Sequence, residues 1–214
     1  MSLTCVTGAT GPLGKKICFA LAKRGVPLLL HYKSNDAAGK ELAKMCGADL
    51  VQFDFSQDCD PFCQELVDRG VDRIVHTVGP YLIKGPSETS PQQWKEQLQL
   101  NFHTPVDLIT NLLPSLSSFL ALGVSGLEKE RANTYCTAYW TAKKSLLMAL
   151  KAFAKEFPDK QFNMVSPGHM EHSVDCNKTP VKAEDVAELI AYLLSEHALS
   201  ITGQNIEIAR GFAL

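Results

Sequence analysis

The stretch Thr7-Gly8-Ala9-Thr10-Gly11-Pro12-Leu13-Gly14 joins a short apolar run, residues 3–6, to an amphipathic segment, residues 13–24. At such a junction Gly8 allows a tight turn, Gly11 lets the backbone approach a pyrophosphate, and Gly14 permits close packing of helix on strand. The unpaired N–H groups at the start of the helix then face the anion. The stretch predicts a dinucleotide-binding turn, with a purely structural glycine-rich turn as the alternative. Its candidate binding residues are Gly8, Thr10, Gly11, Leu13 and Gly14.

Short apolar runs alternate with longer amphipathic segments along the whole chain. The expected strands cover residues 3–6, 27–32, 49–53, 72–77, 119–124, 161–165 and 204–208. The expected helices cover residues 13–24, 37–46, 61–68, 91–113, 136–157 and 182–195. Near-continuous runs of Val, Leu and Ile suit strands that are buried on both faces of a parallel sheet. The pattern predicts an α/β fold with one domain over residues 1–214, a doubly wound parallel sheet of about seven strands with helices on both faces.

Capping residues and prolines mark the ends of these helices. Gly25 and Gly47 stand where a helix ends in a left-handed residue. Ser90 precedes Pro91, as an N-cap precedes the first helical position. Pro105 falls inside the expected helix 91–113 and predicts a kink or a division there.

Composition narrows the class of protein. The chain has 214 residues, 45% of them hydrophobic, and its 21 basic and 23 acidic side chains nearly cancel to −2. No basic run favours nucleic acid or an anionic membrane, and no apolar run approaches the length of a bilayer span. The seven scattered cysteines are expected to be free thiols in a reducing cytoplasm, without a metal site. No signal peptide is recognisable ahead of the first strand.

The end of the second expected strand reads His31-Tyr32-Lys33-Ser34. NAD-binding turns of this kind place an acidic residue there, which binds the ribose hydroxyls. This strand end has no acid, and a cation beside a hydroxyl suits the 2′-phosphate of NADP instead. Tyr32, Lys33 and Ser34 thus predict a preference for NADP(H) over NAD(H), unless Lys33 and Ser34 only form a solvated turn.

Tyr139 and Lys143 lie four residues apart, so that on a helix they share one face. A neighbouring ammonium group and an oxidised nicotinamide favour a phenolate, which leads us to expect a lowered pKa for Tyr139. Tyr139 could then exchange a proton with a carbonyl oxygen. The spacing alone occurs by chance, and its weight comes from its place in the helix after the fifth strand.

Together these features resemble the short-chain dehydrogenase/reductase family, over nearly the whole chain. The matching blocks are residues 7–14, Asp54, His76-Thr77-Val78-Gly79, Asn101, Tyr139-x-x-x-Lys143, Pro167-Gly168 and Ile201-Thr202-Gly203-Gln204. The resemblance implies a Rossmann fold, a nicotinamide dinucleotide and an oxidoreductase. Within the family the second strand end looks most like pteridine reductases, and the general pattern like 3-oxoacyl-carrier-protein reductases.

The resemblance also implies roles for single residues. Asp54 and Phe55 would contact the adenine, and Val78 and Gly79 would lie along the ribose and phosphates. Lys143 would bond the nicotinamide ribose, and Asn101 would hold a water that links Lys143 to solvent. Pro167, Gly168 and Met170 would border the nicotinamide. Simpler interpretations remain, since Asp54 and Pro167-Gly168 also suit turns, and Asn101 a kink in a helix.

Several positions depart from the family pattern. Pro12 replaces the middle glycine of the turn, and His76-Thr77 replaces two amides that brace the sheet. The family places a serine thirteen residues before the tyrosine to polarise the substrate, where this chain has Gly126. Ser125, fourteen residues before Tyr139, is the candidate for that role, or else a serine of a strand-end turn.

The expected substrate loop, around residues 168–182, is short. The substrate pocket is therefore expected to be open or to be closed by a partner subunit. His169 and His172 could face it, although a histidine in a loop is more often solvated. Tyr81 could line it or lie on the surface.

The favoured hypothesis is an NADPH-dependent reductase of a small carbonyl or imine substrate, with Asn101, Ser125, Tyr139 and Lys143 as its catalytic residues. The alternative is a dinucleotide-binding regulatory or scaffold protein with a weak or dead site. The family's habit of pairing two helices predicts a homodimer or homotetramer. The residues that could supply that face, or else belong to the core, are Trp94, Leu98, Leu108, Leu112, Leu147 and Leu150.

Overall fold

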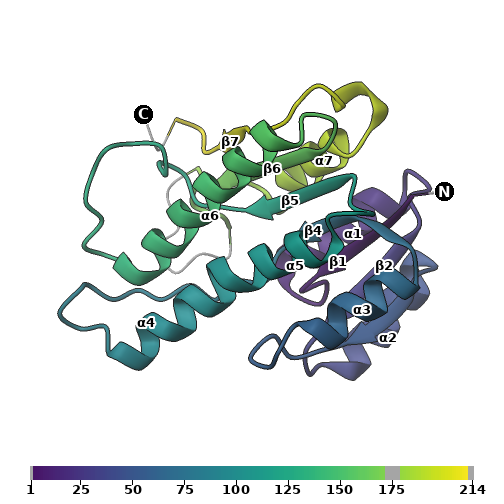
Figure 1. The fold of residues 1–214 in the computed structure, drawn as a ribbon, viewed down its shortest axis with the longest axis horizontal. Coiled ribbons are helices and arrows are strands. Elements are labelled where there is room, and N and C mark those ends of the chain that lie inside the picture. Colours follow the sequence, from purple (N-terminus) through teal and green to yellow (C-terminus); the bar gives the residue numbers. More distant parts are fainter. Residues whose placement is uncertain (1, 172–178, 212–214) are drawn as a thin grey trace.

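The computed structural model describes residues 2–171 and 179–211. Its strands are β1 (Leu3–Thr7), β2 (Leu28–Tyr32), β3 (Asp49–Gln52), β4 (Val71–His76), β5 (Ser118–Leu122), β6 (Gln161–Pro167) and β7 (Asn205–Ile208). They pair in parallel in the order β3-β2-β1-β4-β5-β6-β7 (Figure 1). The seven-stranded, doubly wound sheet expected from the sequence is confirmed, with each strand end within two residues of its predicted place.

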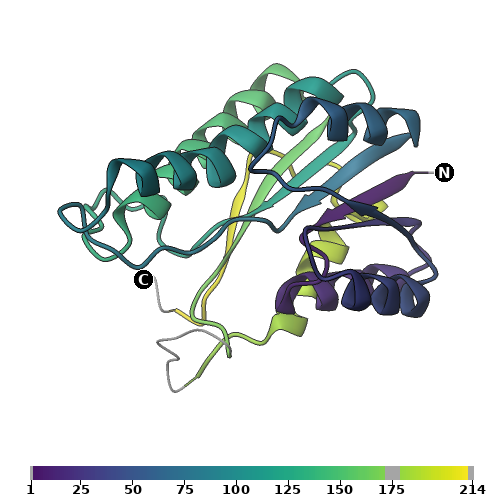
Figure 2. The same cartoon turned by 90° about the horizontal axis from the view of Figure 1, so that it is seen from below.

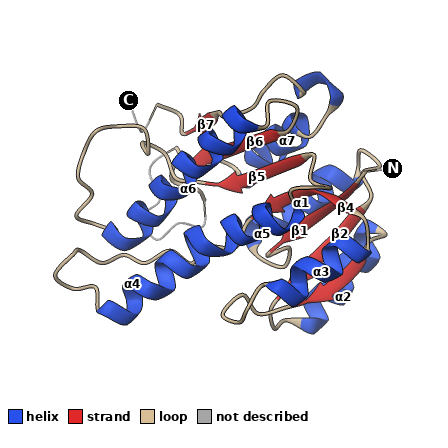
Figure 3. Ribbon diagram, viewed as in Figure 1, coloured by secondary structure: helices blue, strands red, loops and turns tan. Residues whose placement is uncertain are grey.

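The helices are α1 (Pro12–Ala22), α2 (Asp36–Cys46), α3 (Asp60–Asp68), α4 (Pro91–Leu98), α5 (Thr104–Leu112), α6 (Thr137–Glu156) and α7 (Ala183–Leu193). Figure 2 shows the sheet between two helical layers, and Figure 3 shows the strands lying side by side within it. One core joins α3, α5 and α6 to one face of the sheet, and the other joins α1, α2 and α7 to the opposite face.

Successive residues of the central strands point into different cores. Cys5 and Ile74 face the layer of α3, α5 and α6, whereas Val6 and Val75 face the layer of α1 and α7. Both faces therefore require apolar side chains, which is why consecutive apolar residues stand in the middle of these strands.

The expected helix 91–113 is divided, as Pro105 predicts. A π-helical turn, Gln99–His103, separates α4 from α5, and Pro105 occupies the first turn of α5. Because proline cannot donate to the preceding turn, the backbone accommodates it by this wider turn. The π-helical turn carries Asn101, which is fully buried.

Burial decides between the two interpretations of the leucines in the helices after β4 and β5. Leu108, Leu112, Leu147 and Leu150 are at most 3% exposed and belong to the core, so they cannot supply an association face. They lie on the faces of α5 and α6 that pack against the sheet.

Six cysteines lie in the described residues, all as free thiols, and Cys176 lies outside them. None of the helices in residues 2–171 and 179–211 has the length and apolar character needed to span a bilayer.

The order of the strands places a crevice between β1 and β4. The chain winds toward one edge from β1 to β3 and toward the other from β4 to β7. In doubly wound sheets ligands bind outside the carboxyl ends of the strands at such a reversal. Gly8 follows β1 and Thr77 follows β4, so both border this crevice.

Candidate active site

The glycine-rich turn packs tightly between β1 and α1. Gly8 has a φ of +70°, which glycine adopts without strain. A Cβ atom on Gly14 would lie 2.4 Å from the carbonyl oxygen of Gly8, so helix and turn approach more closely than any side chain allows. The N-cap Gly11 offers no capping side chain, and Pro12 has no N–H. The first-turn amides of α1, beginning with Leu13, are left for an outside acceptor.

The polar side chain of Lys33, just after the end of β2, is paired with a carboxylate that follows β3. Lys33 is 63% exposed, and its Nζ lies 3.0 Å from an Asp54 carboxylate oxygen. Asp54 also accepts the Ser56 N–H, and these two contacts hold the pKa of Asp54 below its ordinary value. Ser34 is exposed beside them. The Lys33 ammonium group beside the crevice therefore already forms an ion pair with the Asp54 carboxylate.

Tyr32 and Phe55 are turned into the protein. The Tyr32 ring packs against Gly39, and its hydroxyl donates to Asp36 at 2.8 Å. Phe55 is 3% exposed and packs against the ring of His31. Because the side chain of Phe55 is buried, a contact with adenine would have to use its backbone, and the adenine contact of Phe55 stays a prediction.

Hydroxyl groups and an imidazole brace β1 against β4, where the family pattern has two amides. The Thr7 hydroxyl lies 3.0 Å from His76 Nδ1 and accepts the N–H of Thr77 at 3.2 Å. The Thr77 hydroxyl donates to the Thr7 carbonyl at 2.6 Å. A Cβ atom on Gly8 would stand 2.7 Å from that hydroxyl. The replacement thus keeps the two strand ends joined beneath the turn.

Asn101, Lys143 and Gly79 meet at one point beyond the end of β4. A Cβ atom on Gly79 would lie 2.4 Å from Asn101 Oδ1 and 2.9 Å from Lys143 Nζ. The Asn101 amide nitrogen donates to Gln97 at 3.1 Å and to the Pro80 carbonyl at 3.3 Å. Asn101 Oδ1 has no hydrogen-bond partner among the described residues. A buried acceptor without a partner and a buried ammonium group therefore both lie against Gly79.

Tyr139 and Lys143 face inward from α6, 8% and 2% exposed. Lys143 Nζ lies 5.8 Å from the centre of the Tyr139 ring. Burial lowers the pKa of Lys143 to about 8. Burial also raises the pKa of Tyr139, with a smaller contribution from Cys136. The sequence-based expectation of a lowered tyrosine pKa is therefore wrong for the protein alone, because the loss of solvent outweighs the ammonium.

Ser125 follows β5, and its backbone is held from two sides. Its N–H donates to the Pro167 carbonyl at 3.0 Å, and the N–H of Gly126 donates to the Glu207 carboxylate at 2.5 Å. A Cβ atom on Gly126 would lie 3.4 Å from the Trp140 ring, which follows Tyr139 in α6. Ser125 is 4% exposed, and its hydroxyl forms no hydrogen bond within the part of the chain that the structure describes. Its proposed role toward a substrate stays a prediction.

The segment after β6 lies along the same edge. Pro167 ends β6, the Gly168 N–H donates to the Ile208 carbonyl at 3.0 Å, and Met170 pairs with Val181. His169 is half-buried, whereas His172 lies outside the described residues, as does 172–178 of the expected substrate loop.

Tyr81 lies beside the candidate proton donor. Its ring meets that of Tyr139 edge to face, with centres 4.8 Å apart, and it is 52% exposed. Tyr81 therefore offers an aromatic edge to whatever approaches Tyr139.

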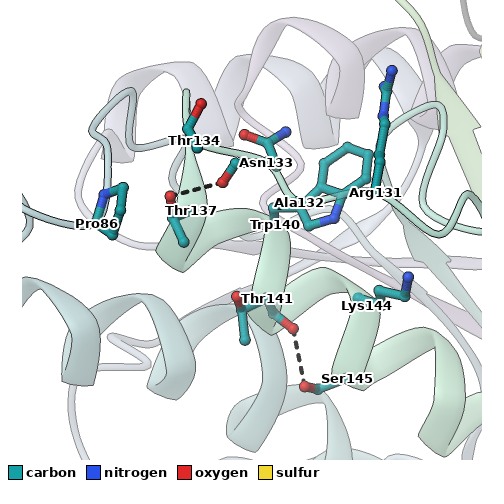
Figure 4. Close-up of a pocket in the computed structure, with 10 residues that line it drawn as sticks. All are labelled: Pro86, Arg131, Ala132, Asn133, Thr134, Thr137, Trp140, Thr141, Lys144 and Ser145. Carbon is teal, nitrogen blue, oxygen red and sulfur yellow. Dashed lines mark hydrogen bonds between the residues drawn. The ribbon is translucent and has the colours of Figure 1, made fainter.

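A separate pocket of about 460 Å³ opens on the other face of α6 (Figure 4). Arg131 lies over the Trp140 ring there, 5.6 Å from its centre. The residues that line it are Pro86, Arg131, Ala132, Asn133, Thr134, Thr137, Trp140, Thr141, Lys144 and Ser145. No candidate site residue is among them, so this pocket is distinct from the crevice at β1 and β4.

Three supporting residues escaped the sequence analysis. Gln97 binds the Asn101 amide, Glu207 holds the turn after Ser125, and the His31 ring accepts the N–H of Gly8. The partners in the last two pairs stand 81 and 23 residues apart, and strand register alone brings them together. Only Gln97 had a sequence signal, its position four residues before Asn101.

Comparison with known proteins gives matches over nearly the whole chain. Residues 8–213 match a family model described as enoyl-(acyl carrier protein) reductase. The oxidoreductase YmfI of Bacillus subtilis is 31% identical over 234 residues, which cover 97% of each chain. The 3-oxoacyl-[acyl-carrier-protein] reductase FabG of Aquifex aeolicus is 25% identical over 98% of this chain and 96% of its own. The structure of BdcA in complex with NADPH superposes with a TM-score of 0.86 at 20% identity, over 97% and 93% of the two chains.

Proposed function

Since the chain belongs to the short-chain dehydrogenase/reductase family, we propose that it is an NADP(H)-dependent reductase of a carbonyl or imine group. The observation that carries this proposal is the buried pair Tyr139 and Lys143 on one face of α6, with Lys143 against Asn101 and Gly79 beside the crevice. A buried phenol beside a buried ammonium suits proton transfer to a substrate.

The residues around the crevice fit a dinucleotide. The uncapped amides of α1 suit its phosphates, along with Gly8, Thr10, Gly11 and Gly14. The unpartnered Asn101 Oδ1 and the Lys143 ammonium suit its ribose hydroxyls and an ordered water. Val78 and Gly79 would lie along its ribose and phosphates. Pro167, Gly168 and Met170 would border the nicotinamide, and Asp54 with the Phe55 backbone would contact the adenine.

The dinucleotide, when bound, supplies the hydride. Tyr139 gives its phenolic proton to the oxygen or nitrogen that gains negative character. Because burial raises the pKa of Tyr139, this side chain is protonated at neutral pH, which is the form that reduction needs. Lys143 stabilises the phenolate left behind, and Ser125 orients the carbonyl by a hydrogen bond.

NADP(H) is preferred over NAD(H) in this proposal because of charge. Lys33 and Ser34 are exposed at the end of β2, and neither position carries the acid that would repel a 2′-phosphate. Asp54 already binds Lys33, and a phosphate there would compete for the ammonium or share it. In this proposal the whole chain, 1–214, forms the nucleotide-binding domain, and copies associate as a homodimer or homotetramer.

The test is consumption of NADPH with a panel of substrates. The panel holds aldehydes, quinones, a 3-ketoacyl thioester, a dihydropteridine and an enoyl thioester, the last because reduction of a C=C bond would contradict a carbonyl or imine substrate. Tyr139→Phe is expected to abolish turnover and keep nucleotide binding. Tyr192→Phe removes an exposed phenol of α7 and serves as the control that keeps turnover. Tight NADPH binding without any turnover would instead favour a regulatory dinucleotide-binding protein.

A further inference from the structure

His31 lies in β2, yet its side chain reaches the turn after β1. The N–H of Gly8 donates to His31 Nδ1 at 3.0 Å, and His31 Nε2 lies 3.0 Å from the Phe53 carbonyl oxygen. A backbone N–H can only donate a hydrogen bond, and a carbonyl oxygen can only accept one. Nδ1 must therefore be the unprotonated nitrogen and Nε2 must carry the proton. These two contacts fix both the charge and the tautomer of the ring.

The ring is fixed in place by its surroundings. His31 is 1% exposed, and the rings of Phe55 and Phe62 lie 4.6 and 5.2 Å from its own, centre to centre. Burial lowers the pKa of His31 to about 4, which agrees with the neutral ring that its hydrogen bonds require. The acceptor nitrogen consequently points at Gly8 and cannot turn away.

The same residue binds the turn a second time. The N–H of Ala9 donates to the backbone carbonyl of His31 at 2.9 Å. Two successive amides of the turn, those of Gly8 and Ala9, are thus held by one residue of β2. The Gly8 carbonyl in turn accepts the Gly11 N–H at 3.0 Å, which sets the direction in which the chain enters α1.

We infer that His31 is a positioning residue for dinucleotide binding, whose Nδ1 atom holds the Gly8 amide and thereby sets the turn that receives the phosphates. This inference rests on the proposed function for the presence of the dinucleotide. The contact acts beneath the pyrophosphate, which NADH and NADPH share. Loss of the acceptor should therefore weaken both nucleotides equally, whereas removal of Lys33 should weaken NADPH selectively.

A matched pair of substitutions separates the two hydrogen bonds. In His31→Asn the amide oxygen stands as many bonds from the backbone as Nδ1, so it can still accept the Gly8 N–H. In His31→Gln the amide nitrogen stands where Nε2 stood, so it can reach the Phe53 carbonyl but leaves the Gly8 N–H unpaired. Phe62→Leu is the packing control, because it removes a ring contact of His31 and leaves both hydrogen bonds in place.

Dissociation constants for NADH and NADPH are measured by fluorescence titration, with unfolding midpoints for every variant. We expect about a tenfold rise for both nucleotides in His31→Gln, the size of effect that a buried unpaired N–H produces. His31→Asn and Phe62→Leu should stay within about threefold of wild type. For active preparations, KM for the nucleotide should rise in His31→Gln while kcat at saturation stays unchanged.

The inference is overturned if His31→Gln binds like wild type, or if His31→Asn loses as much affinity as His31→Gln, since the ring would then act through packing alone. If the variants do not fold, ¹⁵N chemical shifts of His31 in the wild-type protein decide, because a protonated Nδ1 cannot accept from Gly8. A wild-type protein that binds neither nucleotide contradicts the proposed function instead, and the same shifts still report the contact with Gly8.

Discussion

At the scale of single residues, burial sets the charge of the groups in the candidate site. Lys143 is 2% exposed and no carboxylate forms an ion pair with it among the described residues. Its ammonium therefore loses hydration without gaining an opposite charge, which lowers its pKa to about 8. A buried unpaired charge costs stability, so the gain from folding alone does not account for the position of Lys143.

Lys143→Met is expected to stabilise the nucleotide-free protein by roughly 3 kcal/mol at pH 7, since a pKa unit corresponds to about 1.4 kcal/mol. Between pH 8 and 10.5 the unfolded chain keeps the lysine proton and the folded protein releases it. The free energy of unfolding of the wild type therefore rises with pH, relative to that of the variant, across this window. Urea unfolding at pH 7 and pH 9.5 measures the difference. Lys144→Met, one residue along, is the control, and an equal gain there would contradict the argument.

A second prediction at this scale concerns the choice of nucleotide. Lys33→Ala combined with Ser34→Ala should raise the dissociation constant of NADPH about tenfold and that of NADH by less than threefold, because only NADPH carries the 2′-phosphate. Lys40→Ala removes a cation of α2 that pairs with Asp36 and is the control for general charge. Isothermal titration with both nucleotides measures the effect, and equal losses would remove the basis for the NADP(H) preference.

At the scale of elements, close approach of backbone positions the site. α1 meets the end of β1 where Gly14 lies against the Gly8 carbonyl, and the π-helical turn brings Asn101 to Gly79. Neither contact tolerates a side chain on the glycine. The turn that would receive the phosphates and the buried ammonium of Lys143 are therefore placed by backbone packing, which is stiffer than a loop.

Gly14→Ala tests this packing. Alanine favours a helix over glycine by about 1 kcal/mol, but here its Cβ would lie 2.4 Å from a backbone oxygen, and overpacking costs about 1–3 kcal/mol. We expect a net loss in the free energy of unfolding, measured by urea titration. Gly11→Ala, whose Cβ would stand 3.3 Å from the same oxygen, should lose less. A variant Gly14→Ala as stable as wild type would show that α1 shifts freely.

At the scale of the whole molecule, two buried histidines lie in neighbouring parts of one sheet core. His31 belongs to β2 and His76 ends β4, and the ring of Phe55 contacts both. Burial lowers the pKa of His31 to about 4 and that of His76 to about 3. Both rings stay neutral in the fold under conditions in which an unfolded chain would protonate them.

This difference predicts acid sensitivity of the fold. Above pH 6.5 the two histidines are unprotonated in both the folded and the unfolded state. Below pH 6.5 they are protonated first in the unfolded chain, so the free energy of unfolding falls as the pH drops toward 4. From pH 6.5 to 5 the loss is roughly 2 kcal/mol per histidine. His31→Asn should show about half of the wild-type loss in urea unfolding at the two pH values. His197→Asn, which removes an exposed imidazole, is the control, and an unchanged loss in His31→Asn would refute this account.

The sequence by itself determined the fold class, the seven strands and the place of the glycine-rich turn. The period of apolar residues reports burial on one or both faces, and the glycine spacing of residues 8–14 reports a backbone that must turn tightly and pack closely. Both patterns are local, because they depend only on residues that are close to one another in the chain. The spacing of Tyr139 and Lys143 likewise fixed their common face, because a helix has a known period.

Only the tertiary structure decided the contacts between distant segments. The hydrogen bond from Gly8 to His31, the hydroxyl bridge between Thr7 and Thr77, and the inward turn of Phe55 depend on strand register and on packing across the sheet. The rise in the pKa of Tyr139 was also decided there, since its sign depends on how much solvent the fold removes. Local patterns carry no information on these quantities, because each of them is a sum over neighbours that the chain brings together only on folding.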